Sequence, residues 1–127
     1  MRLSLECRLV VAGRLIAGSS ALVAAGALAA ATVAPGAAQR SAIIRAFGDP
    51  PVAGPCLIVR LAASDRRYAD VRFRPTTSCA RWAFNGVNVL ERTATGAWKI
   101  HFEGSSYRCP IPHVPRAVQR DLGVCPT

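Results

Sequence analysis

The stretch GVNVLERTATGAWKIHFEG, residues 86–104, decides the fold because apolar and polar side chains alternate on both sides of a turn. Alternation with a period of two predicts strands that bury one face. TATG supplies the turn of an antiparallel hairpin. The expected cross-strand pairs are Val89 with Ile100 and Val87 with Phe102. Apolar pairs of this kind stabilise a sheet by ~0.2–1 kcal/mol each.

A further hairpin is indicated upstream. CLIVRLA, residues 56–62, is strongly apolar, and in YADVRFR, residues 68–74, Val71 and Phe73 alternate with charged side chains. SDRR between the two segments is typical of a turn. Pro75 ends the second strand because proline cannot donate to a strand ladder. We therefore expect four antiparallel strands in two hairpins.

The C-terminal tail, CPIPHVPRAVQRDLGVCPT at 109–127, indicates a short helix after an extended proline-rich segment. RAVQRDLG, residues 116–123, follows a proline and ends at a glycine, as helices commonly do. Val114, Val118 and Leu122 are spaced four apart and form one apolar stripe. A helix of about two turns is unstable alone, so we expect it to dock on the sheet.

SAIIRAFG, residues 41–48, indicates another short helix before the strands. Ser41 suits its start and Gly48 its end. Its apolar face consists of Ile43, Ile44 and Phe47. The expected fold is α+β: a four-stranded antiparallel sheet that carries the N-terminal helix and the C-terminal helix on one face.

Residues 1–38 have the pattern of a secretory signal. Three arginines, at positions 2, 8 and 14, precede an uncharged apolar run at 15–34, and the small residues GAA at 36–38 follow it. We expect cleavage after Ala38, which leaves residues 39–127 as one small secreted domain with no integral membrane segment. The alternative is an uncleaved anchor, because the run approaches the ~20 residues that span a bilayer.

The expected domain retains four cysteines, namely Cys56, Cys79, Cys109 and Cys125. An even number of cysteines in a short exported chain indicates disulfides, which help a small domain with a thin core. Four cysteines allow three pairings. A Cys56–Cys79 bond would pin the open end of the 56–74 hairpin. A Cys109–Cys125 bond would clamp the C-terminal helix, contributing roughly 3 kcal/mol in the chain-entropy model.

The expected domain is strongly basic. Of the chain's 16 Lys and Arg and 7 Asp and Glu residues, 13 and 6 lie in 39–127, a net charge of +7. With the apolar side chains inward, an outer sheet face would carry Arg60, Arg72, Arg74, Lys99 and His101. Such a face attracts nucleic acid, an acidic envelope glycan or lipid headgroups. The alternative, and the commoner case, is an ordinary solvated face, since Asp70 and Glu103 would lie there too.

Residues suited to metal binding or catalysis are few. Cys109, His113, Cys125 and His101 match zinc ligands in type, but the chain has no CxxC pair of the kind that structural zinc sites use. Cysteines that all pair leave no free thiol for nucleophilic catalysis. The acidic residues are scattered along the chain. We therefore expect a non-enzymatic protein without a cofactor.

Short motifs carry a family resemblance. They are GAW at 96–98, Cys109, VPRAV at 114–118, DLG at 121–123 and Cys125, with a weaker match in YADVRF at 68–73. In these motifs the chain resembles small secreted cysteine-containing proteins from high-GC actinobacteria and their relatives, a group with no assigned activity. The resemblance implies the second hairpin, the final helix and its disulfide. It implies no catalytic or ligand-binding residues.

These features favour an exported monomeric protein that binds at the cell envelope or outside the cell, with an anionic envelope polymer or a protein as its partner. Two alternatives stay open. One is a secreted enzyme inhibitor, because the expected fold with two disulfides is similar in outline to the cystatin fold, although that family's QxVxG motif is absent. The other is a zinc-dependent enzyme, which requires bound metal and free thiols.

Overall fold

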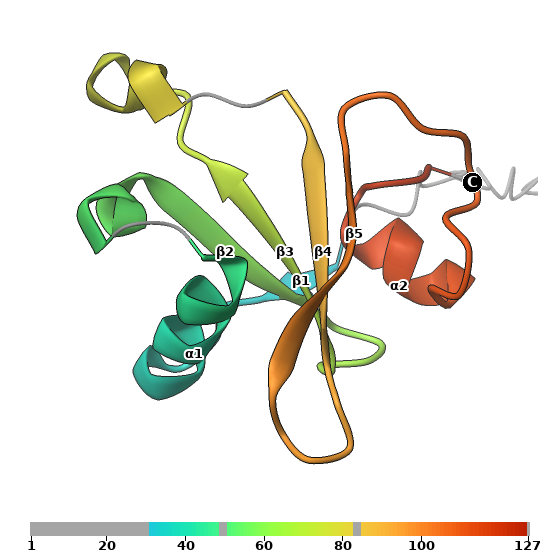
Figure 1. The fold of residues 1–127 in the computed structure, drawn as a ribbon. Coiled ribbons are helices and arrows are strands. Elements are labelled where there is room, and N and C mark those ends of the chain that lie inside the picture. Colours follow the sequence, from blue (N-terminus) through green and yellow to red (C-terminus); the bar gives the residue numbers. More distant parts are fainter. Residues whose placement is uncertain (1–30, 49–50, 83–84, 127) are drawn as a thin grey trace, which may run out of the picture.

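A five-stranded antiparallel sheet organises the protein (Figure 1). The structure, a computed structural model, describes residues 31–48, 51–82 and 85–126. The elements in chain order are β1 (Thr32–Val33), α1 (Ala37–Phe47), the 3₁₀ helix η1 (Pro51–Cys56), β2 (Leu57–Ala62), β3 (Tyr68–Phe73), the 3₁₀ helix η2 (Thr77–Trp82), β4 (Val87–Arg92), β5 (Trp98–Gly104) and α2 (Arg116–Asp121). Each strand pairs with its neighbour along the chain. The α+β class is confirmed, but the expected number of four strands is wrong.

The additional strand is β1, which lies within the segment that the sequence assigns to the leader. Its pairs with β2 are Thr32–Ala62 and Val33–Leu61. The Ala63 N–H also donates to the Ala31 carbonyl at 3.0 Å. Sequence reasoning misses this strand because its two residues continue an alanine-rich run without alternation. The rest of the expected leader, residues 1–30, lies outside the described residues.

Helix α1 starts earlier than the sequence indicates. Gly36, not Ser41, precedes the first turn, and the Arg40 N–H donates to the Gly36 carbonyl at 2.8 Å. Alanines join the helix there because alanine has the highest helix propensity. The expected end is confirmed, since Gly48 adopts a left-handed conformation (φ 83°) and its N–H closes the last turn. Neither α1 nor any other helix in the described ranges is long and apolar enough to cross a membrane.

A β-bulge changes the register of the β4–β5 hairpin. Val87 pairs with Gly104, Val89 with Phe102 and Leu90 with Ile100, so the expected pairs Val89–Ile100 and Val87–Phe102 are both wrong. His101 is the extra residue on β5, between the two paired positions. Because it interrupts the alternation, Ile100 and Phe102 lie on opposite faces of the sheet. The β2–β3 hairpin, in contrast, pairs regularly along its whole length.

Helices α1 and α2 cover opposite faces of the sheet (Figure 1), which we call the α1 face and the α2 face. The buried cluster of the α1 face comprises Ile43, Leu57, Val59, Leu61, Ala69, Val71 and Leu90. The cluster of the α2 face comprises Ala62, Tyr68, Val87, Val89, Ile111, Val114, Val118, Leu122, Val124 and Cys125. The expectation that both helices share one face is wrong. The bulge turns Phe102 toward Val89, and the resulting apolar patch is covered by α2 and its flanking segments.

A buried glutamine holds the tail together. Gln119 in α2 is 1 % exposed. Its Oε1 accepts a hydrogen bond from the Ile111 N–H at 2.8 Å, and its Nε2 donates to the carbonyls of Ile111 (2.9 Å) and Val114 (2.7 Å). These bonds satisfy buried backbone groups in a segment whose prolines prevent regular pairing.

The two tryptophans occupy different environments. For residues 80–86 the sequence is compatible with a bulged strand or with a loop. The structure places the first part of this segment in the 3₁₀ helix η2. There Trp82 is half-buried beneath the Arg81 guanidinium, 4.9 Å from its ring centroid. Residues 83–84 lie outside the described residues. Trp98 packs at the margin of the buried cluster of the α1 face, as its alternation predicts.

Candidate functional site

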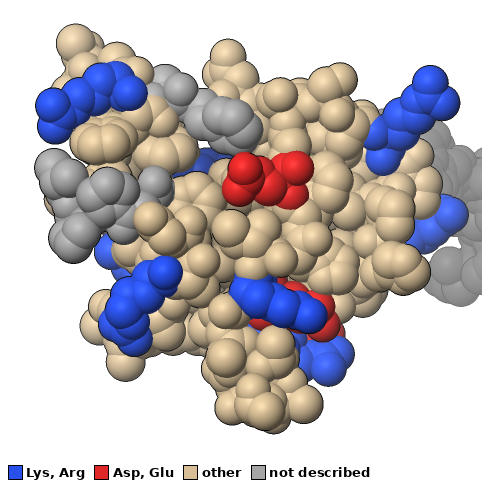
Figure 2. All heavy atoms as spheres, viewed as in Figure 1, with Lys and Arg blue, Asp and Glu red and all other residues tan. Residues whose placement is uncertain are grey.

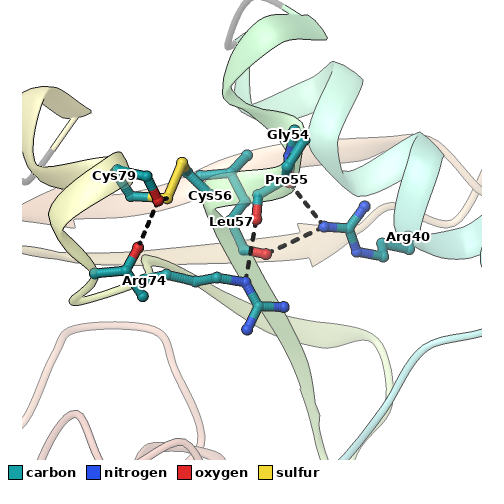
Figure 3. The surroundings of a disulfide bond; sticks show 9 residues. Arg40, Gly54, Pro55, Cys56, Leu57, Arg74 and Cys79 are labelled. Carbon is teal, nitrogen blue, oxygen red and sulfur yellow. Dashed lines mark hydrogen bonds between the residues drawn. A yellow bond between two sulfur atoms is a disulfide. The ribbon is translucent and has the colours of Figure 1, made fainter.

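Both cysteine pairs expected from the sequence are disulfide bonds. Cys56–Cys79 joins η1 to η2 with Cα atoms 5.5 Å apart (Figure 3). Cys109–Cys125 closes the loop that contains α2, with Cα atoms 5.7 Å apart. Two disulfides fit an oxidising location outside the cytoplasm. Their sulfur atoms are bonded to each other and do not supply the thiolates that a zinc site or a cysteine nucleophile requires.

Two arginines brace the segment before β2 (Figure 3). Arg40 Nη2 donates to the carbonyls of Gly54 at 2.9 Å and Leu57 at 3.1 Å. Arg74 Nε donates to the Pro55 carbonyl at 3.1 Å. Arg74, a residue of the expected anion-binding face, therefore lies past the end of β3, and its exposed guanidinium forms an intramolecular hydrogen bond.

The other four residues of the expected anion-binding face share the α2 face but do not converge. Arg60 is opposite Asp70 in the register, and Lys99 is opposite Glu91. These two exposed cations lie three strands apart, on the order of 15 Å at strand spacing, with the buried cluster of the α2 face between them. The face that the sequence leaves open to solvent is thus partly covered by α2.

Arg72 is engaged by two internal partners. Its Nε donates to Asp70 Oδ2 at 2.6 Å, and its Nη2 donates to the Leu122 carbonyl at 2.9 Å. The second bond ties β3 to the end of α2. Asp121 in the same helix accepts a hydrogen bond from the Ser64 N–H at 2.7 Å, which lowers the pKa of Asp121. Arg72 therefore anchors the tail, although 42 % of its side-chain surface stays exposed.

Asp70 is a buried carboxyl group in the sheet. It is 3 % exposed, and its Oδ1 has no hydrogen-bond partner within the described residues. Burial raises the pKa of Asp70 to about 6, although the charge and hydrogen bond of Arg72 and the charge of Arg60 act in the opposite direction. Asp70 consequently destabilises the folded state in its charged form.

The Asp70→Asn variant is expected to be more stable than the wild type near neutral pH, by up to about 3 kcal/mol for a pKa rise of roughly two units. A carboxyl with a raised folded-state pKa binds more protons in the folded state, so its contribution grows as the pH falls from about 6 toward 3.8. The variant lacks this contribution. Urea unfolding of both proteins across this window measures the difference between them, and a difference that stays constant with pH contradicts the assignment.

A histidine–glutamate–tyrosine group lies beside α2. His101 Nδ1 is 2.9 Å from Glu91 Oε2, and the Tyr68 hydroxyl donates to Glu91 Oε1 at 3.4 Å. His101 Nε2 lies 3.4 Å from the Pro112 carbonyl. Burial, followed by the charge of Glu91, raises the pKa of Tyr68. His101 is thus committed to contacts that hold the tail to β5, and this use could not be read from its position in the alternation.

A small cavity of about 260 Å³ lies against the second disulfide. Its lining residues are Cys109, Pro110, Arg116, Gln119, Cys125 and Pro126. Arg116 is the one charged residue among them, and the side-chain polar atoms of Gln119 are bonded to backbone groups. This cavity therefore holds none of the paired acid–base groups that hydrolytic chemistry uses.

The remaining cationic side chains are spread over the surface. Within the described residues, thirteen Lys and Arg accompany five Asp and Glu, and Arg67 and Arg72 alone among these cations form ion pairs. Figure 2 shows the blue side chains as separate groups around the outline of one face, with acidic groups between them. The cationic surface is distributed and has no single centre on this face.

The described ranges contain no group of three or more His, Cys, Asp and Glu side chains that could hold a metal ion. The distributed cationic surface is therefore the candidate functional feature. Comparison of the chain with protein-family models, with curated proteins and with solved structures finds no match, so the resemblance to small secreted actinobacterial proteins stays a prediction.

Proposed function

We propose that the protein is an exported, non-enzymatic binding module that acts as a monomer and engages an anionic polymer of the cell envelope. The observation that carries this proposal is the excess of Lys and Arg side chains that form no ion pair with a carboxylate within the described residues. Two disulfides and a tail bonded to the sheet support it further, because they suit a small domain that must stay folded outside the cell.

Distributed charge predicts a particular mode of binding. Each cation that contacts the polymer displaces counterions, so affinity falls as salt rises and depends on the number of contacts. The internal bonds of Arg72 and Arg74 leave exposed side chains such as Arg60 and Lys99 as the better contacts. Binding of this kind needs neither a pocket nor a conformational change.

The proposal is tested by retention on a dextran sulfate column at rising salt. Two double variants carry the same change in charge: Arg60→Glu with Lys99→Glu on the α2 face, and Arg66→Glu with Arg108→Glu in exposed loops. Both are expected to elute at clearly lower salt than the wild type, by similar amounts, because four units of charge are lost in each.

The outcomes separate three cases. Similar shifts in both double variants support distributed binding. A shift confined to Arg60→Glu with Lys99→Glu would restrict binding to the α2 face and contradict the distributed form. A wild-type protein that passes through the column at low salt would exclude an anionic polymer as partner. Circular dichroism spectra of the variants control for folding.

A second candidate function, secreted enzyme inhibition, is favoured by one end of the sheet. Five strands in chain order with α1 across one face are similar in outline to the cystatin fold, although α2 on the second face departs from it. At this end Thr32 pairs with Ala62, and the Arg92 N–H donates to the Arg67 carbonyl at 2.7 Å. Three chain segments thus lie side by side at this end of the sheet. An inhibitor of this outline would insert such an edge into the cleft of an enzyme. Stoichiometric loss of activity in one protease class would support this candidate, and full activity in every class would count against it.

A further inference from the structure

The segment before α1 is part of the folded domain. Thr32 and Val33 pair with β2, and Val33 packs against the buried cluster of the α1 face. The Gly36 carbonyl accepts the hydrogen bond that starts α1. Cleavage after Ala38, the position that the sequence suggests, would remove all of these contacts.

The loss would extend beyond β1 itself. α1 holds η1 through the two hydrogen bonds of Arg40, and Arg40 lies in the first turn of this helix. A chain that began at Gln39 would place Arg40 at the frayed end of a shortened helix, without the Gly36 carbonyl as acceptor. Leu61 and Ala62 would also lose their strand partners at the sheet edge. A cleavage site that preserves the domain must therefore lie before β1.

A suitable sequence occurs at that point. Ala29, Ala30 and Ala31 place small residues at the positions that signal peptidases require, directly before Thr32. Residues 34–36 separate β1 from α1 without helical structure, whereas Ala37 and Ala38 belong to the first turn of α1. Cleavage after Ala31 removes the Ala31 carbonyl that accepts from the Ala63 N–H, but it keeps both strand pairs of β1. Cleavage after Ala38 leaves a domain without β1.

We propose that Ala31–Thr32 is the processing site of the exported protein. Signal peptidase adds water to the Ala31 carbonyl carbon, the peptide bond breaks, and Ala31 keeps the new carboxylate while Thr32 keeps the new α-amine. β1 then becomes the first element of the mature chain. This inference rests on the proposed export, and it replaces Ala38 with Ala31 as the residue before the cut.

The test expresses the full chain in an exporting actinobacterial host and determines the N-terminal residue of the protein in the medium by mass spectrometry. Thr32 is the expected terminus. A secreted protein that begins at Gln39 overturns the inference and leaves export intact. A protein that stays in the cells with residues 1–31 attached overturns both export and the inference.

Two matched substitutions locate the site independently. Ala31→Leu puts a large side chain directly before the cut and is expected to abolish the Thr32 terminus. Ala38→Leu, at an exposed helix position, is expected to leave Thr32 as the terminus. The reverse pattern assigns cleavage to Ala38. Urea unfolding tests separately whether β1 stabilises the domain. The oxidised chain 32–127 is expected to have a higher urea midpoint than the oxidised chain 39–127, and equal midpoints would contradict this role of β1.

Discussion

The Gln119→Leu variant is expected to lose about 3 kcal/mol or more of its free energy of unfolding. Leucine fills a similar volume but leaves the Ile111 N–H and the carbonyls of Ile111 and Val114 buried without partners. Each unsatisfied buried polar group costs about 1–3 kcal/mol. The loss is measured by urea unfolding of the oxidised protein, followed by circular dichroism.

Gln39→Leu is the matched control, because it makes the same substitution in the other helix. Gln39 is only half-buried and forms no side-chain hydrogen bond within the described residues. Its replacement is expected to change the unfolding free energy by about 0.5 kcal/mol or less. Equal effects of the two variants would mean that the Gln119 hydrogen bonds do not hold the tail.

The double variant Cys109→Ala with Cys125→Ala is expected to lose roughly 3 kcal/mol, because the disulfide spans a sequence separation of 16 residues. The unfolded chain gains the freedom that the cross-link removed. In the folded state, α2 is then held by Gln119, by Arg72, by the hydrogen bond from Ser64 to Asp121 and by its apolar stripe. Urea unfolding of the variant and the wild type measures the loss, and a change below about 1 kcal/mol would contradict the role of this disulfide as a clamp.

Removal of the other disulfide provides the control. Cys56→Ala with Cys79→Ala is expected to lose a comparable free energy, since the separation is 23 residues. The two variants are expected to differ in which backbone amides lose protection from hydrogen exchange. Hydrogen exchange of the Gln119 and Leu122 amides is expected to accelerate with loss of Cys109–Cys125 and to stay slow with loss of Cys56–Cys79. Equal acceleration of exchange in both variants would mean that the Cys109–Cys125 disulfide does not specifically hold α2 in place.

The elements with strong local patterns could be predicted from the sequence. An apolar run located β2, alternation located β3, β4 and β5, and the Pro115 and Gly123 signals located α2 to within two residues. The ends of those elements favoured the two observed disulfides among the three possible pairings, because a bridge is limited to a Cα separation of ~4.4–6.8 Å. These inferences needed only neighbours in the chain.

Features that depend on tertiary contacts could not be predicted in this way. A single extra residue, His101, moved Phe102 to the other face and so created a second core for α2. β1 has two residues and no alternation, and it exists as a strand because Leu61 and Ala62 offer an edge. The hydrogen bonds of Gln119 join positions that the local pattern does not relate.

The expected anion-binding face also shows that local sequence patterns do not predict tertiary contacts. Strand periodicity put Arg60, Arg72 and Lys99 on the face where the register has them. It carried no information about the bulge at His101 or about what covers that face. Arg72 and His101 proved to have internal partners from β3, β4 and the tail. The sequence offered no signal for this cover, because the burial of Asp70, which implies a covered face, is seen only in the structure.

The most direct test of the proposed function is a titration of the mature oxidised protein with dextran sulfate at a series of salt concentrations. The account predicts that the dissociation constant rises steeply with salt. A plot of its logarithm against the logarithm of the salt concentration is expected to be linear, as for several simultaneous cation contacts. Absence of binding at low salt, or an affinity that does not change with salt, would contradict it.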